Sequence, residues 1–335
     1  MNRKMFVWSF WIFALVVLLF GTIVFSLCVG SANISFEETI RSIFKQADTI
    51  EAGIIFNIRL PRIILGFAIG GALSIAGVIL QGMFRNPLVE PYTIGISGGA
   101  ALAVALNIAL GLQATVGILS LPVFGFLGAV LVVALVYFLS LKKGILQIHG
   151  LLLTGVMISF VSSSLIMLIM AVSRQESLHG IIFWIMGSLE EPNWILIKIA
   201  FLVSILGLAI SYLFCLDLNA FSQGEEQAMH LGVDTERAKR LLFIVASLLT
   251  GLSVSIAGII GFVGLVVPLF MRMLVGNDHR ILLVSSYLSG AVFLIFCDTL
   301  ARILISPMEL PVGVITGILG GTVFIYTLAK KRCFI

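Results

Sequence analysis

About ten long apolar runs divide this chain, and they constrain its fold more than any other feature. The runs lie near 6–29, 60–83, 94–112, 116–140, 146–172, 193–216, 240–260, 262–275, 281–304 and 312–329. A helix needs about 20 apolar residues to cross the hydrocarbon core of a bilayer. Because 60% of the residues are hydrophobic and only 11% are charged, the chain has too little polar surface for a water-soluble globule. The sequence therefore predicts an integral membrane protein.

The apolar runs are continuous rather than alternating, which favours helices over a transmembrane barrel. We expect an all-α, polytopic membrane protein with about ten transmembrane helices. Runs seven and eight join through Gly258, Gly261 and Gly264, so nine spans is the alternative. An even number of spans places both termini on the same side of the membrane.

The positions of the basic residues predict the orientation. Most of the 20 Lys and Arg residues lie in segments that share a side with the N-terminus, so the positive-inside rule predicts cytoplasmic N- and C-termini. The run from Phe6 to Val29 is long enough to be the first membrane helix rather than a cleaved signal peptide. Arg59, Arg62 and Arg302 are exceptions, because they lie at helix ends on the opposite side.

The stretch from Arg59 to Ala100 combines a glycine-rich apolar helix with a polar break. Gly and Ala let helix backbones approach closely, as in membrane helices that pack tightly. The break at Arg85-Asn86-Pro87, followed by Pro91, predicts an interrupted helix rather than a simple anchor. A broken helix at membrane depth is tolerated only where protein or a water-filled cavity covers it. A simple loop is the alternative.

The chain also resembles itself. A shift of 181 residues lays Gly70, Ser74–Gly77, Pro87–Leu88 and Gly95 onto Gly251, Ser255–Gly258, Pro268–Leu269 and Gly276. Five crossings separate the two copies, so they run in opposite directions. We therefore expect one transmembrane domain over 1–335, built as an inverted repeat of two five-helix halves, about 1–180 and 181–335. Inverted repeats are typical of transporters, whose pathway lies at the repeat interface.

Two polar segments have their own helical patterns. The predicted internal loop 219–240 contains a short helical pattern through Ala228 and Leu231, then Gly232, then a second helix from near Asp234. This pattern predicts a compact docking site for a soluble partner, and an ordinary solvated connector is the alternative. Near the other side, a capping box at Ser35 predicts a short amphipathic helix along the outer interface.

No catalytic or metal-binding motif is present in the sequence. The Cys and His residues are scattered singly, which argues against a metal site, and no basic stripe with aromatic residues indicates nucleic-acid binding. Asp298 is the main charge inside an apolar run, and we expect it to pair with Arg302 one turn later. The scarcity of such charges argues against an ion-coupled carrier and for an outside energy source.

Motifs along nearly the whole chain resemble the FecCD-type permease family, the membrane subunits of binding-protein-dependent ABC importers for iron(III)-siderophores, haem and cobalamin. The matching blocks are Arg59–Arg62; Gly70–Leu73 with Ala76, Gly77 and Gln81; Arg85–Leu88 with Pro91; Gly95–Gly98 with Ala100; Gly224–Glu226 with Leu231 and Gly232; Gly261–Leu265 with Pro268 and Arg272; Asp278–Arg280; Asp298 with Ala301 and Arg302; and Glu309–Gly313. One departure is Leu269, where many members carry His after the proline.

The resemblance implies a permease subunit that translocates a metal chelate inward across a bacterial or archaeal cytoplasmic membrane. An iron(III)-siderophore is the first expectation for the substrate, and cobalamin or haem is the alternative. The implied partners are a second permease subunit, two ATP-binding subunits and an extracytoplasmic substrate-binding protein. The chain itself is expected to bind no cofactor and to be no enzyme, because ATP is used by the partner subunits. A secondary transporter is the main rival class, and a membrane-embedded enzyme or a structural bundle is a weaker one.

The resemblance also assigns roles to residues. Arg59, Arg62 and Arg302 match arginines that receive acidic residues of the binding protein, and Arg suits this role because it binds carboxylates as a planar fork. Snorkelling of these arginines to lipid headgroups is the alternative. The residues that match the inner end of the pathway are Asn86, Pro87 and Leu88. The residues that match the ATPase coupling loop are Gly224, Glu225, Glu226, Ala228, Leu231 and Gly232.

Overall fold

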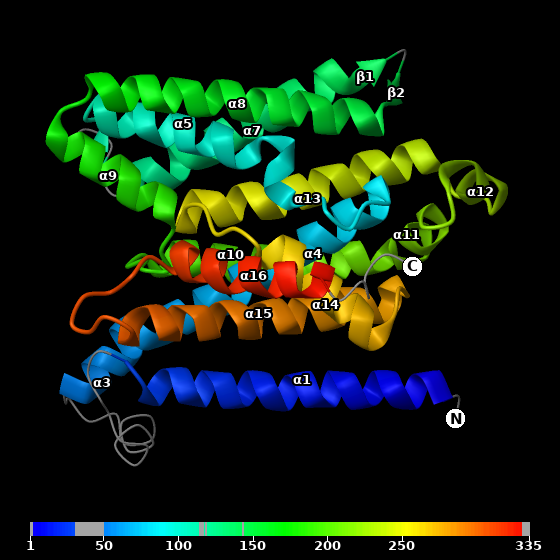
Figure 1. Cartoon of the computed structure of the whole chain (residues 1–335), viewed down its shortest axis with the longest axis horizontal. Coiled ribbons are helices and arrows are strands. Elements are labelled where there is room, and N and C mark those ends of the chain that lie inside the picture. Colours follow the sequence, from blue (N-terminus) through cyan, green and yellow to red (C-terminus); the bar gives the residue numbers. More distant parts are fainter. Residues whose placement is uncertain (1–2, 31–49, 114–116, 118, 143, 330–335) are drawn as a thin grey trace.

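The computed structural model describes residues 3–30, 50–113, 117, 119–142 and 144–329, and it consists mainly of helices (Figure 1). The long ones are α1 (Arg3–Cys28), α4 (Leu60–Phe84), α7 (Ser120–Ser140), α8 (Ile148–Val172), α10 (Trp194–Leu213), α13 (Thr235–Ala257) and α15 (His279–Ile303). The shorter ones are α3 (Ile50–Ile54), η1 (Ile55–Arg59), η2 (Pro91–Ile94), α5 (Ile96–Ala109), α9 (Gln175–Met186), α11 (Cys215–Phe221), α12 (Glu225–His230), α14 (Val263–Val275) and α16 (Val312–Ala329). Within the described ranges, the only strands are β1 (Leu141–Lys142) and β2 (Ile145–Leu146), which pair in antiparallel fashion. The all-α prediction is confirmed.

Each predicted apolar run contains a helix. Among the described residues, 7 helices are long and apolar enough to cross a membrane, and α5, α14 and α16 are shorter apolar helices. The second of the seven begins earlier than expected, because the helix continues upstream from α4 through η1 to Ile50. Runs seven and eight form separate helices, since α13 ends before Gly258 and α14 begins after Phe262.

Helix α4 is the centre of the bundle. Within its apolar stretch 89% of the residues are buried, against 22% for α1 and 17% for α8, which lie at the periphery. It packs against α10, α13, α14 and α15. The backbone approaches are close: a Cβ at Gly70 would lie 2.3 Å from the carbonyl oxygen of Gly290, and one at Gly77 would lie 1.8 Å from that of Gly264. Glycine is therefore required at these crossings.

The long helices lie side by side along the long axis of the molecule (Figure 1). The start of α1, the β1–β2 hairpin and α12 share one end, and α3 and α9 share the other. Helices α4 and α13 run in opposite directions, as the internal repeat predicts. Their lengths differ, because α13 ends at Ala257 whereas α4 continues eight residues past the matching Ala76, to Phe84. The division into two halves stays a prediction, and the predicted helix at Ser35 lies outside the described residues.

Candidate functional site

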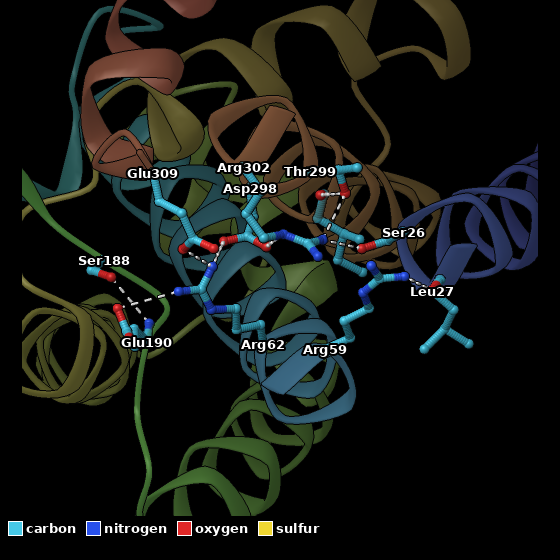
Figure 2. A network of polar contacts seen from close by, with 11 residues as sticks. Ser26, Leu27, Arg59, Arg62, Ser188, Glu190, Asp298, Thr299, Arg302 and Glu309 are labelled. Atoms are coloured by element: carbon cyan, nitrogen blue, oxygen red, sulfur yellow. Dashed lines mark hydrogen bonds and ion pairs between the residues drawn. The ribbon is translucent and has the colours of Figure 1, made fainter. Parts of the chain in front are cut away.

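Three predicted arginines come together at the end of the bundle that holds α3 and α9 (Figure 2). Arg59 ends η1 and Arg62 lies one turn later on α4, so both side chains lie on one helix face. Arg302 is in the last turn of α15, which packs against α4. All three are buried, with exposed fractions of 2%, 6% and 2% in sequence order.

Carboxylates of the same chain surround Arg62. Its Nη1 lies 2.7 Å from Oε2 of Glu309 and 4.0 Å from Oδ1 of Asp298, and its Nη2 lies 3.3 Å from Oε2 of Glu190. The exposed members are the glutamates, whose side chains are 75% exposed at Glu190 and 32% exposed at Glu309. An incoming carboxylate that reaches Arg62 must therefore displace one of these two.

Asp298 and Arg302 form the predicted pair within α15. The Arg302 Nε lies 3.0 Å from Oδ2 of Asp298, and its Nη2 donates to the hydroxyl of Ser26 at 2.7 Å. Arg59 donates through Nη1 to the carbonyl of Leu27. Buried charges are costly unless they are paired and hydrogen-bonded, so this network satisfies that requirement while it joins α1, α4 and α15.

The predicted gate lies in a tight turn after α4. Arg85 ends the helix with a left-handed backbone (φ 48°), and the amide of Asn86 donates back to the carbonyl of Gln81 at 3.2 Å. The side chain of Asn86 then accepts from the amide of Leu88 at 2.9 Å, which closes a second turn around Pro87. Pro87 is half-buried, whereas Asn86 and Leu88 are exposed. The predicted helix break is confirmed, and the three predicted gate residues lie at the surface of the single chain.

Gln81 connects this turn to the break between α13 and α14. Its Nε2 lies 3.3 Å from each of the carbonyl oxygens of Val89, Gly264 and Leu265. Its Oε1 accepts from Nη1 of Arg272 at 2.5 Å. A single amide thus bridges two interrupted helices with both of its ends.

Two further side chains strengthen the same connection. Oε1 of Glu90 accepts from the amide of Phe262 at 2.7 Å. The hydroxyl of Tyr92 donates to the carbonyl of Ile260 at 3.1 Å and accepts from the amide of the same residue at 3.2 Å. These bonds satisfy backbone groups that the helix break leaves without helical partners, as a membrane interior requires.

The predicted coupling loop folds as a helix, a turn and a second helix. Helix α12 covers Glu225–His230, and α13 starts after Asp234, whose side chain accepts from the amide of Arg237 at 3.1 Å. Of the predicted coupling residues, Gly224 at the N-cap of α12 and Ala228 on its inner face are buried. The exposed ones are Glu226, Leu231 and Gly232, and Leu231 is 66% exposed.

Lys239 holds α12 onto α13. It is 1% exposed, and its Nζ lies 2.7 Å from Oε1 of Glu225 and also pairs with Glu236. Oε2 of Glu236 in turn accepts from the amide of Leu146 in β2 at 3.0 Å. Glu225 is thus turned toward Lys239 rather than fully outward, and α12, α13 and the β1–β2 hairpin form one connected unit.

A model of the FecCD transport family matches residues 16–330. The chain belongs to the FecCD transport family. It is 40% identical over 279 residues to the cobalamin import system permease protein of Halobacterium salinarum, covering 83% of this chain and 74% of that one. It is 38% identical over 278 residues to the hemin transport system permease protein of Yersinia pestis, covering 82% and 83%. The chain is also similar to a metal-chelate type ABC transporter solved in an inward-facing conformation, with 33% identity, 96% and 99% coverage and a TM-score of 0.83.

Membership of the FecCD family confirms the resemblance that the motifs indicate. It also identifies the chain as a membrane-embedded transport permease rather than an enzyme. Sequence reasoning gave no role to Gln81 and Arg272, although both lie in the matching blocks, nor to Glu90, Tyr92 and Lys239. A polar side chain within an apolar run, such as Gln81, is the signal that points to such a residue.

Replacement of Asp298 by Asn tests the buried pair. The change leaves Arg302 charged in a buried site, so we expect a loss of about 3 kcal/mol or more in the free energy of unfolding. The matched control is Glu190→Gln, which also removes a carboxylate from the network but at an exposed position, with an expected loss below about 1 kcal/mol. Unfolding in mixed detergent micelles measures both, and equal small losses would contradict the assignment.

Proposed function

We propose that this chain is the transmembrane permease subunit of a binding-protein-dependent ABC importer that carries a metal chelate inward across a bacterial or archaeal cytoplasmic membrane. The family match over residues 16–330 carries this proposal. The relatives that import cobalamin and hemin support a metal chelate as the substrate class. Within that class an iron(III)-siderophore is the first candidate, and cobalamin and haem are the alternatives.

The mechanism is alternating access without covalent chemistry. Two permease copies enclose a central pathway, and ATP hydrolysis in two separate subunits provides the bias between the inward- and outward-open states. The turn of Asn86, Pro87 and Leu88 narrows the inner end of the pathway. Its exposure on the single chain leaves these residues available to a second copy or to the substrate.

The end of the bundle that holds α12 faces the cytoplasm in this proposal. Met229 on α12 and Leu231 directly after it are 52% and 66% exposed, and the opposite face of α12 is held by buried Ala228 and by the pair of Glu225 with Lys239 of α13. A rigid helix with an exposed apolar edge is suited to a groove in a soluble partner. We assign this edge to the ATP-binding subunit.

The opposite end receives the substrate-binding protein. Arg62 is the arginine best placed for docking, because its partners Glu190 and Glu309 are partly exposed and can be exchanged for carboxylates of the partner. Docking then replaces internal ion pairs with intermolecular ones. Arg59 and Arg302 hold Arg62 in place through the helices that they join to α4.

Uptake by proteoliposomes tests the function and the substrate together. The chain is reconstituted with the ATPase and the binding protein of its importer, and uptake of an iron(III)-siderophore, cobalamin and hemin is compared. We expect ATP-dependent uptake of one chelate and none when the ATPase is omitted. Gradient-driven uptake without the ATPase would instead support a secondary transporter.

Replacement of Leu231 by Asp is expected to uncouple ATP hydrolysis from transport. A charge on the apolar edge of α12 weakens the contact with the ATPase without disturbing the buried face. We expect uptake per ATP hydrolysed to fall roughly tenfold, the equivalent of about 1.4 kcal/mol in the contact. Leu110→Asp is the matched control, because Leu110 is 68% exposed and lies outside this segment. Unchanged coupling in Leu231→Asp would remove α12 from the mechanism.

Replacement of Arg62 by Gln is expected to weaken capture of the binding protein roughly tenfold, which corresponds to about 1.4 kcal/mol of binding free energy. Arg174→Gln is the matched control, since it removes an exposed positive charge beyond the end of α8. Surface plasmon resonance measures capture, and thermal melting confirms that each variant is folded. Full capture by folded Arg62→Gln would overturn the docking assignment.

A further inference from the structure

A recess of about 430 Å³ lies beside the gate turn. Its walls come from the end of α4, the turn after it, the segment after α11, α14 and the first residue of α15. Three side chains that the transport mechanism above does not use line it, namely Arg85, Arg272 and His279. No Asp or Glu is among the lining residues. The volume falls within the range of about 300–1,000 Å³ that is typical of small-molecule sites.

Both arginines lack a carboxylate partner within the part of the chain that the structure describes. Arg85 is exposed, and its side chain makes no hydrogen bond or ion pair with the described residues. Arg272 is half-buried and donates to the neutral amide of Gln81. Two guanidinium groups thus face one recess with their positive charges uncompensated, which favours an anionic ligand.

His279 adds a defined hydrogen-bond acceptor. Arg280 pairs with Asp278 at 2.6 Å and holds the pKa of that carboxyl at about 2, so Asp278 is ionised and can only accept. It accepts from Nδ2 of Asn219 at 3.1 Å, which turns the amide oxygen of Asn219 toward Nδ1 of His279 at 2.8 Å. The Nδ1 of His279 therefore carries the proton, and the neutral ring has its lone pair on Nε2.

The Nε2 of His279 is buried and has no hydrogen-bond partner among the described residues. His279 as a whole is 3% exposed. A buried polar atom without a partner is costly, and one at the wall of a recess indicates a ligand that completes it. The missing partner must be a donor, whereas the two arginines require acceptors.

We propose that this recess binds a phosphate oxyanion that carries a hydroxyl group, such as inorganic phosphate. The oxygens of the anion accept from Arg85 and Arg272, and its hydroxyl donates to Nε2 of His279. A phosphodiester, as in most lipid headgroups, has no hydroxyl on its phosphorus to donate to this nitrogen. Free phosphate therefore fits the three groups better than a lipid headgroup does.

A bound phosphate would join the gate turn to α14 and α15. Arg85 directly precedes Asn86, and Arg272 already contacts Gln81, so one anion would link the two interrupted helices. The binding itself does not depend on the proposed transport function. It is measured on the purified chain without the ATPase or the binding protein.

Isothermal titration of the purified full chain in an uncharged detergent, at constant ionic strength, tests the site. We expect saturable binding of inorganic phosphate that weakens roughly tenfold or more in Arg85→Gln, because a hydrogen bond to a charged group is lost. Arg85 is exposed, so this variant is expected to fold. The matched control is Arg237→Gln, which removes an exposed arginine at the start of α13 outside the recess and should bind phosphate as the wild type does.

Two further probes identify the source of the anion. Sulfate has the shape of phosphate but no hydroxyl at neutral pH, and phosphatidylglycerol, followed by native mass spectrometry, presents a phosphodiester. Both are expected to bind more weakly than phosphate. Absence of saturable phosphate binding, or equal affinity in Arg85→Gln and the wild type, would overturn the site. Tighter binding of sulfate or of the lipid would overturn the role given to His279.

Discussion

The hydrogen bonds between two interrupted helices are the constraint on which this structure depends. A helix break inside a membrane leaves amide and carbonyl groups that lipid cannot satisfy. Here the break after Phe84 and the break after Ala257 face each other, and Gln81, Glu90 and Tyr92 supply the missing partners. The second break therefore depends on side chains near the first for its hydrogen-bond partners. The same bonds hold the irregular backbone beside the proposed gate in place.

The three buried arginines, Arg59, Arg62 and Arg302, show what the low dielectric of the protein interior means for charged side chains. An unpaired charge in a buried site is too costly to be stable. The chain must therefore supply partners for Arg59, Arg62 and Arg302 even when no other protein is bound. The chain supplies its own carboxylates and hydroxyls instead. The docking that we propose at this end would then be an exchange of partners, in which Glu190 and Glu309 are replaced by acidic residues of the binding protein. Such an exchange favours specificity and reversibility over raw affinity.

Much of the architecture could be predicted from local sequence patterns. The apolar runs gave the positions of the helices, Pro87 indicated the break, and the spacing of Asp298 and Arg302 indicated their pair. These features depend on residues that are near each other in the chain. The helical continuation upstream to Ile50 escaped prediction, because a π-turn carries the helix through Arg59 without a sequence signal for its start.

The connections of the site were less accessible to sequence reasoning. Gln81 meets Gly264 and Arg272 across more than 180 positions, and no spacing rule links such residues. The burial of Arg59, Arg62 and Arg302 was not predicted either, since a positive charge at a helix end is compatible with an exposed or an enclosed side chain. Both outcomes depend on how helices pack against α4, which a single sequence does not specify.

The ion pairs of Lys239 make the short helix α12 rigid relative to α13. A helix of six residues is not stable by itself, because isolated helices this short form too few hydrogen bonds to offset the cost of nucleation. The pair of Glu225 with Lys239 instead joins α12 rigidly to the long helix α13. A small displacement at Leu231 would then move α13 as a unit and reach the break at its far end, which Tyr92 bonds.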